Sequence, residues 1–344
     1  MRLDDPTLDS ISPQVRDAWL VEAVRNQIAY MRAQVPYWQQ RLKQAAVDES
    51  SIATLADLAR VPILSKHELR ALRPAALVPE ESLPRLQISR WTSGTSGRPT
   101  VNFWSESDWT ALVAATSRML ARQAPMTRPT AFNAYSHAHV TGPLFHDALR
   151  RLGGVVYDRS QHAEEFFSTL AQTELFDFDT LVLRVGNVGG KSIGLTNLLD
   201  DDPTFLARHG VRWWIGSSGT IGTESMDRVR QQGVERISDL YGSSEFAVFA
   251  ISCPEAPDDY HVAQGHVLVE VVDETGVPVA NDQFGRIVVT HLRGTDANGD
   301  ACVHGGTQIL RLANGDGATF LGEPCACGLT TPRLRDVQRV GTAN

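Results

Sequence analysis

Apolar residues in the first eighty positions recur at the spacing of α-helices. One predicted helix face carries an apolar residue at every third or fourth position, at Val21, Val24, Ile28, Met31 and Val35. Pro36 is expected to end this helix, because proline cannot donate the backbone hydrogen bond that a continuing helix needs. A similar pattern runs over residues 52–72 around Pro62. Residues 1–80 are therefore predicted to form an N-terminal helical segment.

Residues 81–240 alternate between strand-like and helical runs. A strand is predicted over 86–91, followed by a loop over 92–99, a second strand, and a helix over 107–122. The later runs are strands over 130–135, 155–158 and 181–185 and helices over 143–152 and 163–173. This alternation is typical of an α/β core with a largely parallel sheet flanked by helices.

After Tyr241 the pattern changes to short strands separated by turn residues. Residues 266–272 and 285–292 have the composition of strands, and the turn sequence Asp273-Glu274-Thr275-Gly276 lies between them. Residues 241–344 are therefore predicted to form a small antiparallel β subdomain. The predicted fold class is α/β, with mixed sheets flanked by helices and this subdomain added.

Composition and charge narrow the class of protein. With 42% hydrophobic and 21% charged residues in 344, the chain is typical of a soluble globular protein. Acidic residues outnumber basic ones, 40 to 32, and no block of lysine and arginine occurs, which argues against nucleic-acid or anionic-membrane partners. The N-terminus carries Asp4, Asp5 and Asp9 where a secretory signal would be basic and then apolar. A cytoplasmic location is expected.

The loop over 92–99 has the composition of a phosphate-binding loop. Gly94 and Gly97 leave backbone N–H groups unobstructed, and the hydroxyls of Ser93, Thr95 and Ser96 add further donors. The Gly-Lys-Ser/Thr ending of a Walker loop is absent. A polar hairpin turn is the equally simple alternative.

The sequence Tyr241-Gly242-Ser243-Ser244-Glu245 follows a strand-like run near the end of the α/β region. Glu245 would then stand at the carboxyl edge of the sheet, where ligands of open α/β sheets bind. A carboxylate next to nucleotide phosphates is a suitable Mg²⁺ ligand. The alternative is an ordinary surface glutamate.

Cysteine and histidine residues form a candidate metal site. Two pairs distant in sequence, Cys253 with His261 and Cys325 with Cys327, suit a tetrahedral structural Zn²⁺. Ordinary buried cysteines are one alternative, and Cys302 with His304 is a competing pair of ligands.

Tyr135 ends the strand predicted over 130–135, and His137 lies just beyond it; both are candidates for a substrate pocket. Histidines in such positions are more often hydrogen-bonded wall residues than ligands. Both interpretations stay open for His137.

Taken together and in order, the motifs resemble those of the adenylate-forming enzymes, and within them the branch of the phenylacetate–coenzyme A ligases. The motifs that carry the resemblance are Tyr37-Trp38, Leu55–Leu58, Val61–Lys66, Thr92–Pro99, Trp214–Gly219, Tyr241–Glu245, Leu310–Asp316, Cys325–Gly328 and Arg335–Arg339. They are spread over nearly the whole chain. The resemblance implies the large domain of that superfamily, with residues 1–80 helical, 81–240 as core and 241–344 ending at a hinge.

The resemblance also implies a role for individual residues. It assigns Thr95 and Ser96 to the β- and γ-phosphates, Glu245 to Mg²⁺ and Tyr241 to adenine. Asp316 would hold the ribose hydroxyls, and Arg339 the ribose or phosphate region. Further nucleotide contacts fall to Ser93, Gly94, Gly97, Ser217, Ser218, Gly219, Gly242 and Ser244. The acid would contact Tyr135, His137, Gly216 and Ala247.

The activity implied is ATP-dependent activation of an aryl or small carboxylic acid as an acyl-adenylate. Coenzyme A, another thiol, an amine or a carrier protein would accept the acyl group, with ATP and Mg²⁺ required and Zn²⁺ structural. The family's C-terminal lid and its catalytic lysine are expected to be absent, since the chain ends at Asn344 and its last lysine is Lys191; Arg98 is the internal substitute. The alternative is a lid-less, non-catalytic nucleotide- or acyl-adenylate-binding partner in biosynthesis. The oligomeric state stays open, with a homodimer as one alternative.

Overall fold

The computed structural model describes residues 5–86, 88–91, 100–158, 177–186, 194–217, 219, 221–292 and 305–341. The chain divides into two compact units, each built from separate segments. Unit 1 comprises Met1–Ala115, Ser243–Phe246 and Asp258–Asn344. Unit 2 comprises Thr116–Gly242 and Ala247–Pro257. The N-terminal helices and the C-terminal β-rich segment therefore belong to the same unit.

The N-terminal helices of unit 1 follow the predicted periodicity. α1 (Pro13–Gln34) begins where the Ser12 side chain accepts a hydrogen bond from the backbone of Val15, and it ends before Pro36 as predicted. Pro36 then begins α2 (Pro36–Gln44), because the fixed φ of proline suits the first helical position.

The segment over 52–72 is less regular than its apolar pattern predicts. It forms the 3₁₀ helix η3 (Leu55–Arg60) and the short helix α3 (Lys66–Ala71), with an extended stretch around Pro62 between them. Pro62 has no backbone N–H, so a continuous helix cannot run through it without losing a hydrogen bond. Further 3₁₀ helices are η1 (Leu8–Ser10), η2 (Glu49–Ser51), η4 (Pro74–Leu77) and η5 (Glu80–Arg85).

Two short strands and a helix follow in unit 1. β1 (Ile88–Trp91) pairs antiparallel with β2 (Val101–Trp104), so two strands flank positions 92–99 as predicted. α4 (Glu106–Ala121) begins in unit 1 and continues into unit 2.

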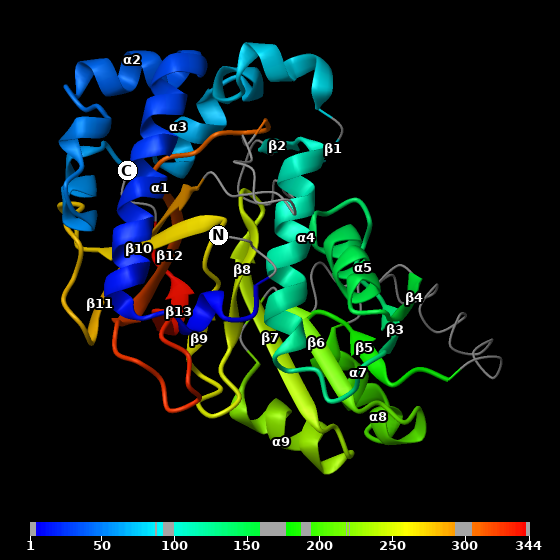
Figure 1. Ribbon diagram of the computed structural model, residues 1–344. Coiled ribbons are helices and arrows are strands. Elements are labelled where there is room, and N and C mark those ends of the chain that lie inside the picture. The colour runs from blue at the N-terminus through cyan, green and yellow to red at the C-terminus, as the bar shows by residue number, and fades with distance from the viewer. Residues whose placement is uncertain are drawn as a thin grey trace. The chain divides into compact units, whose positions relative to one another are not determined.

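The remaining strands of unit 1 are antiparallel, which confirms the predicted change of pattern after Tyr241. Their order is β10 (Val267–Val272), β11 (Gln283–His291), β12 (Leu312–Leu321), β13 (Arg333–Arg339) and β9 (Tyr260–Val262). Each neighbouring pair runs antiparallel (Figure 1).

Unit 2 contains the predicted parallel sheet. Its parallel strands lie in the order β7 (Arg236–Ser243), β6 (Trp213–Ser217), β5 (Thr180–Val182), β3 (Thr130–Asn133) and β4 (Val155–Asp158). β8 (Ala247–Ser252) neighbours β7. The helices are α5 (Thr141–Arg151), α7 (Leu195–Asp201), α8 (Phe205–Arg208) and α9 (Thr223–Gln231). The helix predicted over 163–173 lies outside the described residues.

The core of unit 2 joins its sheet to its helices. Fully buried Phe132 and Trp214 from the strands belong to one apolar cluster with Leu198 of α7, Phe205 of α8 and Val229 of α9. Burial of these side chains, each contributing about 1.5–3 kcal/mol, is what fixes the helices on the sheet. The α/β class with mixed strand directions and flanking helices is thereby confirmed.

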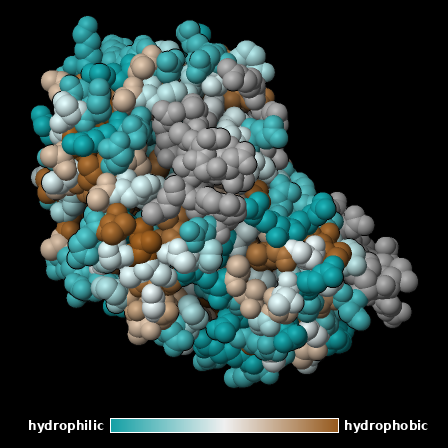
Figure 2. Space-filling model, viewed as in Figure 1, coloured by the Kyte–Doolittle hydropathy of each residue, from teal (hydrophilic) through white to brown (hydrophobic). Residues whose placement is uncertain are grey.

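The face of the molecule in Figure 2 is mostly hydrophilic, with hydrophobic residues in scattered small groups. Exposed large apolar side chains include Val15, Val155 and Phe284. Isolated exposed apolar residues are normal and need no partner. Among the helices that the structure describes, none combines the length and the apolar character needed to cross a lipid bilayer.

Candidate functional site

A tight turn presents Glu245. β7 ends at Ser243, β8 begins at Ala247, and the backbone N–H of Phe246 donates to the carbonyl oxygen of Ser243 at 3.1 Å. Ala247 has a φ of 58°, the left-handed conformation that commonly closes a three-residue turn between strands. A Cβ on Gly242 would lie 2.0 Å from the carbonyl oxygen of Ala247, so only glycine fits beside this turn.

Glu245 is a buried member of an ion pair. Its side chain is 1% exposed, and both carboxylate oxygens accept from Lys66 Nζ, at 3.0 and 3.1 Å. The surface-glutamate alternative is therefore wrong. Nearby, the Asn102 side chain donates to the Ser244 carbonyl oxygen at 3.1 Å, which holds the turn in unit 1.

Lys66 was not among the residues predicted for the site. It is separated from Glu245 by 179 positions, so no local spacing connects the two. One signal was available: Lys43, Lys66 and Lys191 are the only lysines of the chain. A rare lysine inside one of the recurring motifs is a candidate counter-ion for a buried carboxylate.

Asp316 and Arg339, both predicted to contact nucleotide, are cross-strand neighbours on β12 and β13. Arg339 Nη1 lies 3.1 Å from Asp316 Oδ1. The aspartate side chain is 10% exposed and the arginine side chain 79% exposed. The pair therefore offers an anchored carboxylate and a guanidinium that solvent reaches, which suits a ribose hydroxyl and a phosphate respectively.

In unit 2, Tyr135 and Ser217 are hydrogen-bonded to each other. The Ser217 backbone N–H donates to the Tyr135 hydroxyl at 2.7 Å, and the hydroxyl lies 3.0 Å from the Ser217 carbonyl oxygen. Burial raises the pKa of Tyr135, so the phenol stays neutral. A Cβ on Gly216 would lie 2.1 Å from the Trp214 ring, which explains glycine at this position.

His137 belongs to a polar cluster near the carboxyl ends of β3 and β4. His137 Nε2 lies 3.0 Å from Asp158 Oδ1, and His146 Nδ1 pairs with the other carboxylate oxygen. The Asn133 side chain donates to Asp158 at 2.7 Å. His137 is half exposed, so it can be both a hydrogen-bonded wall residue and a group that contacts a ligand.

Tyr241, predicted to stack on adenine, packs edge-on against Phe249, with ring centroids 5.2 Å apart. Gly219 has a φ of 141°, a conformation that favours glycine. Several predicted site residues lie outside the described residues: Ser93, Gly94, Thr95, Ser96, Gly97, Arg98 and Ser218. Their roles stay predictions.

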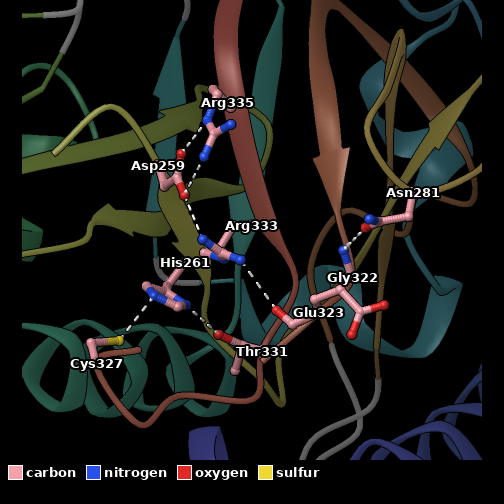
Figure 3. Close-up of polar contacts among 9 residues, drawn as sticks. All are labelled: Asp259, His261, Asn281, Gly322, Glu323, Cys327, Thr331, Arg333 and Arg335. Atoms are coloured by element: carbon pink, nitrogen blue, oxygen red, sulfur yellow. Dashed lines mark hydrogen bonds and ion pairs between the residues drawn. The ribbon is translucent and has the colours of Figure 1, made fainter. Parts of the chain in front are cut away.

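Unit 1 brings together three of the four predicted zinc ligands. The ligand atoms of His261, Cys325 and Cys327 lie within 4.8 Å of one another. His261 Nδ1 contacts Thr331 Oγ1 at 2.9 Å, which leaves Nε2 facing Cys327 Sγ at 3.3 Å (Figure 3). Metal-binding histidines characteristically engage their second ring nitrogen in this way. The donor set therefore fits Zn²⁺.

The surroundings of this cluster hold its ligands in place. The Cys325 N–H donates to the Leu329 carbonyl at 2.9 Å, and Gly328 has a φ of 89°, which closes a tight loop around the two cysteines. Figure 3 shows Arg333 and Arg335 on either side of buried Asp259, two residues before His261. Cys253 lies in unit 2, eight positions before His261, and its ligand role stays a prediction. Cys302 and His304 lie outside the described residues.

Comparison with known proteins identifies relatives along nearly the whole chain, although no protein-family model matches. The chain is 26% identical over 337 residues to the phenylacetate-coenzyme A ligase of Thermus thermophilus, covering 96% of this chain and 71% of that protein. It is 26% identical over 283 residues to the phenylacetate-coenzyme A ligase of Pseudomonas putida, covering 79% of this chain and 61% of that protein.

Among solved structures, the fold resembles that of 2-hydroxyisobutyryl-CoA ligase. The crystal structure of that ligase with 2-HIB-AMP and CoA in the thioesterification state aligns with a TM-score of 0.80 and 20% sequence identity. The alignment covers 97% of this chain and 70% of the ligase. At 20% sequence identity, this similarity is evidence about the fold alone.

Proposed function

We propose that this chain, which is related to the phenylacetate–coenzyme A ligases and has the fold of adenylate-forming ligases, activates a carboxylic acid with ATP as its acyl-adenylate. The observation that carries the proposal is Glu245, a carboxylate 1% exposed and neutralised by Lys66 at the tip of a tight turn. A buried carboxylate is costly unless a cation accompanies it, so this position is built to hold positive charge.

The reaction requires positioning more than side-chain chemistry. The substrate carboxylate attacks the α-phosphate of ATP, the bond to the β-phosphate breaks, and pyrophosphate leaves. Asp316 would accept hydrogen bonds from the ribose hydroxyls, Arg339 would pair with phosphate or ribose, and Tyr241 would contact adenine. The loop with Thr95, Ser96 and Arg98 would meet the β- and γ-phosphates through its N–H groups and hydroxyls.

Mg²⁺ fits the proposed site, because Glu245 supplies an anionic oxygen pair that already accommodates a cation. When bound, the ion would neutralise charge on the phosphate oxygens. Asp316 would hold the ribose on one side of the bond between the α- and β-phosphates, and the loop with Thr95 and Ser96 would hold the β- and γ-phosphates on the other.

The acid is proposed to be an aryl or small aliphatic acid. The relatives are phenylacetate-coenzyme A ligases, and the solved structure with a similar fold is a 2-hydroxyisobutyryl-CoA ligase. Tyr135 would act by holding Ser217 rather than by contacting the acid directly, since Ser217 engages its hydroxyl. His137, Gly216 and Ala247 are the proposed contacts of the acid.

Coenzyme A is the proposed acceptor of the acyl group, with another thiol, an amine or a carrier protein as alternatives. The cytoplasm, where ATP and coenzyme A are available, is the proposed compartment.

Pyrophosphate release, measured with a panel of aryl and small aliphatic acids, tests the proposal. Release that depends on ATP, Mg²⁺ and one group of acids is expected. The alternative function, a non-catalytic nucleotide- or acyl-adenylate-binding protein, predicts saturable binding of ATP or of an acyl-sulfamoyl adenosine without pyrophosphate release from any acid.

Replacing Asp316 by asparagine is expected to weaken ATP binding by about 1–3 kcal/mol, with or without Mg²⁺. The reason is that the neutral amide offers one acceptor oxygen to the two ribose hydroxyls, whereas the carboxylate offers two and carries a charge. Calorimetric titration measures the change, and Asp336→Asn, an exposed residue on the neighbouring strand, is the matched control. A loss confined to titrations with Mg²⁺ would contradict the assignment of Asp316 to ribose.

We further propose that His261, Cys325 and Cys327, with Cys253 as the fourth ligand, hold one structural Zn²⁺. Replacing Cys327 by serine is expected to remove the metal and to lower the free energy of unfolding by several kcal/mol, because metal binding free energy is part of folding free energy. Metal analysis and thermal melts with and without a chelator measure both effects. Cys302→Ser should keep the metal. Purified protein without zinc would disprove the site.

A further inference from the structure

The short extended segment over residues 61–65, called here the strap, lies directly before α3 and is held from one side by Arg311. The Arg311 side chain donates to the Val61 carbonyl oxygen at 2.9 Å. The backbone of Arg311 accepts from the Leu64 N–H at 3.0 Å, and Leu64 in turn accepts from the Ala313 N–H at 2.9 Å. The strap therefore pairs with the start of β12, far along the chain.

Arg311 is itself tightly fixed. It is 1% exposed and donates to both Glu270 carboxylate oxygens, at 3.0 and 3.1 Å, and to the Gly276 carbonyl oxygen at 2.7 Å. Its φ of 45° is left-handed, which is unfavourable for a residue with a side chain. Such strain persists only where the surrounding contacts impose it.

The other side of the strap is held by Arg41. The Arg41 guanidinium donates to the Ile63 carbonyl oxygen at 2.7 Å and to Glu68 at 2.9 Å. Glu68 also accepts from the Ser65 N–H at 2.9 Å, in the capping box that starts α3. Lys66 is the first residue of that helix, so its backbone position is set from both sides.

These contacts place the Lys66 ammonium group beside the Glu245 carboxylate. Lys66 Nζ lies 3.0 and 3.1 Å from the two oxygens of Glu245, whereas Lys43 is exposed on α2. The Lys66 side chain is 14% exposed and that of Glu245 1%. A pair so placed is electrically neutral, and a divalent cation gains less from a neutral pair than from a bare carboxylate.

We propose that Lys66 is the resident cation of the Glu245 site, so that a divalent metal must take the carboxylate from Lys66 in order to bind. The hydrogen bonds of Arg311 to the strap fix the position of Lys66 beside Glu245. The inference rests on the proposed function, since it takes Glu245 as a metal ligand. It goes further by assigning Lys66 as a competitor of the metal and Arg311 as a positioning residue.

Binding of Mn²⁺ to the nucleotide-free protein, followed by electron paramagnetic resonance, tests this assignment. Lys66→Met, which keeps length and removes charge, is expected to bind Mn²⁺ roughly 10- to 100-fold more tightly than the unmodified chain. Lys66→Arg retains the charge and should restore weak binding. Lys43→Met is the control and should change nothing. Thermal melts confirm that each variant is folded.

Two further variants separate the possible failures. Glu245→Gln should abolish this Mn²⁺ site; if it does not, Glu245 is not the metal ligand and the proposed function loses its support. If Glu245→Gln abolishes binding but Lys66→Met leaves the affinity unchanged, the exchange of cations is disproved and the proposed function stands. Arg311→Lys should shift Mn²⁺ affinity toward that of Lys66→Met, a change that a merely structural role for Arg311 would not produce.

Discussion

Replacing Glu245 by glutamine is expected to slow acyl-adenylate formation by roughly 10²- to 10³-fold, because the site loses the carboxylate that holds a cation against the phosphates. The side chain keeps its size, so the turn between β7 and β8 should survive. The Lys66 ammonium, however, loses the carboxylate whose two oxygens lie 3.0 and 3.1 Å away. The effect should therefore appear in the rate and in Mg²⁺ dependence more than in the fold.

Single-turnover formation of acyl-AMP at saturating ATP measures this effect directly. Glu274→Gln is the matched control, since Glu274 is exposed on a turn of unit 1. Thermal melts of both variants separate loss of chemistry from loss of folding. An unchanged single-turnover rate for Glu245→Gln would remove Glu245 from the proposed mechanism.

Replacing Arg311 by methionine is expected to lower the free energy of unfolding by about 3–5 kcal/mol, because it leaves the Glu270 carboxylate buried without its cation. Burial raises the pKa of Glu270, and Arg311 offsets that rise only in part. The carbonyl oxygens of Val61 and Gly276 lose donors as well. A large stability loss from one side chain follows.

Chemical denaturation of the single and double variants tests the origin of this loss. Arg311→Met combined with Glu270→Leu should recover much of the stability, since removing both charges also removes their desolvation cost. Arg339→Met, at a side chain 79% exposed, should change stability by less than about 1 kcal/mol. A double variant no more stable than Arg311→Met alone would show that the backbone contacts, rather than the buried charge, dominate.

Local patterns in the sequence were sufficient for much of the fold. The apolar spacing that predicted a helix up to Pro36 corresponds to α1, and the strand predicted over 155–158 is β4. The alternation of elements indicated a parallel sheet, and the change after Tyr241 indicated antiparallel strands. These features depend on residues close in sequence, where periodicity and turn chemistry act directly.

Periodicity was less informative where proline interrupts an apolar run. Residues 52–72 carry a helical pattern, yet an extended stretch around Pro62 separates η3 from α3. This stretch, the strap, is extended because the start of β12 supplies hydrogen-bonding partners to its backbone. An isolated segment has no such partners, so its extended conformation could not be predicted from its own residues.

By itself, the sequence determined which residue types are available for chemistry: the Tyr241–Glu245 motif, the cysteine and histidine pairs, and the acid at position 316. Only the tertiary structure decided which of them meet. Glu245 forms an ion pair with Lys66, which is 179 positions away in the sequence, and Arg311 donates a hydrogen bond to the Val61 carbonyl oxygen, 250 positions away. Such pairs leave no local spacing in the sequence. They arise because a buried charge or backbone oxygen without a partner costs free energy, and the packing of the elements selects which partner each one finds.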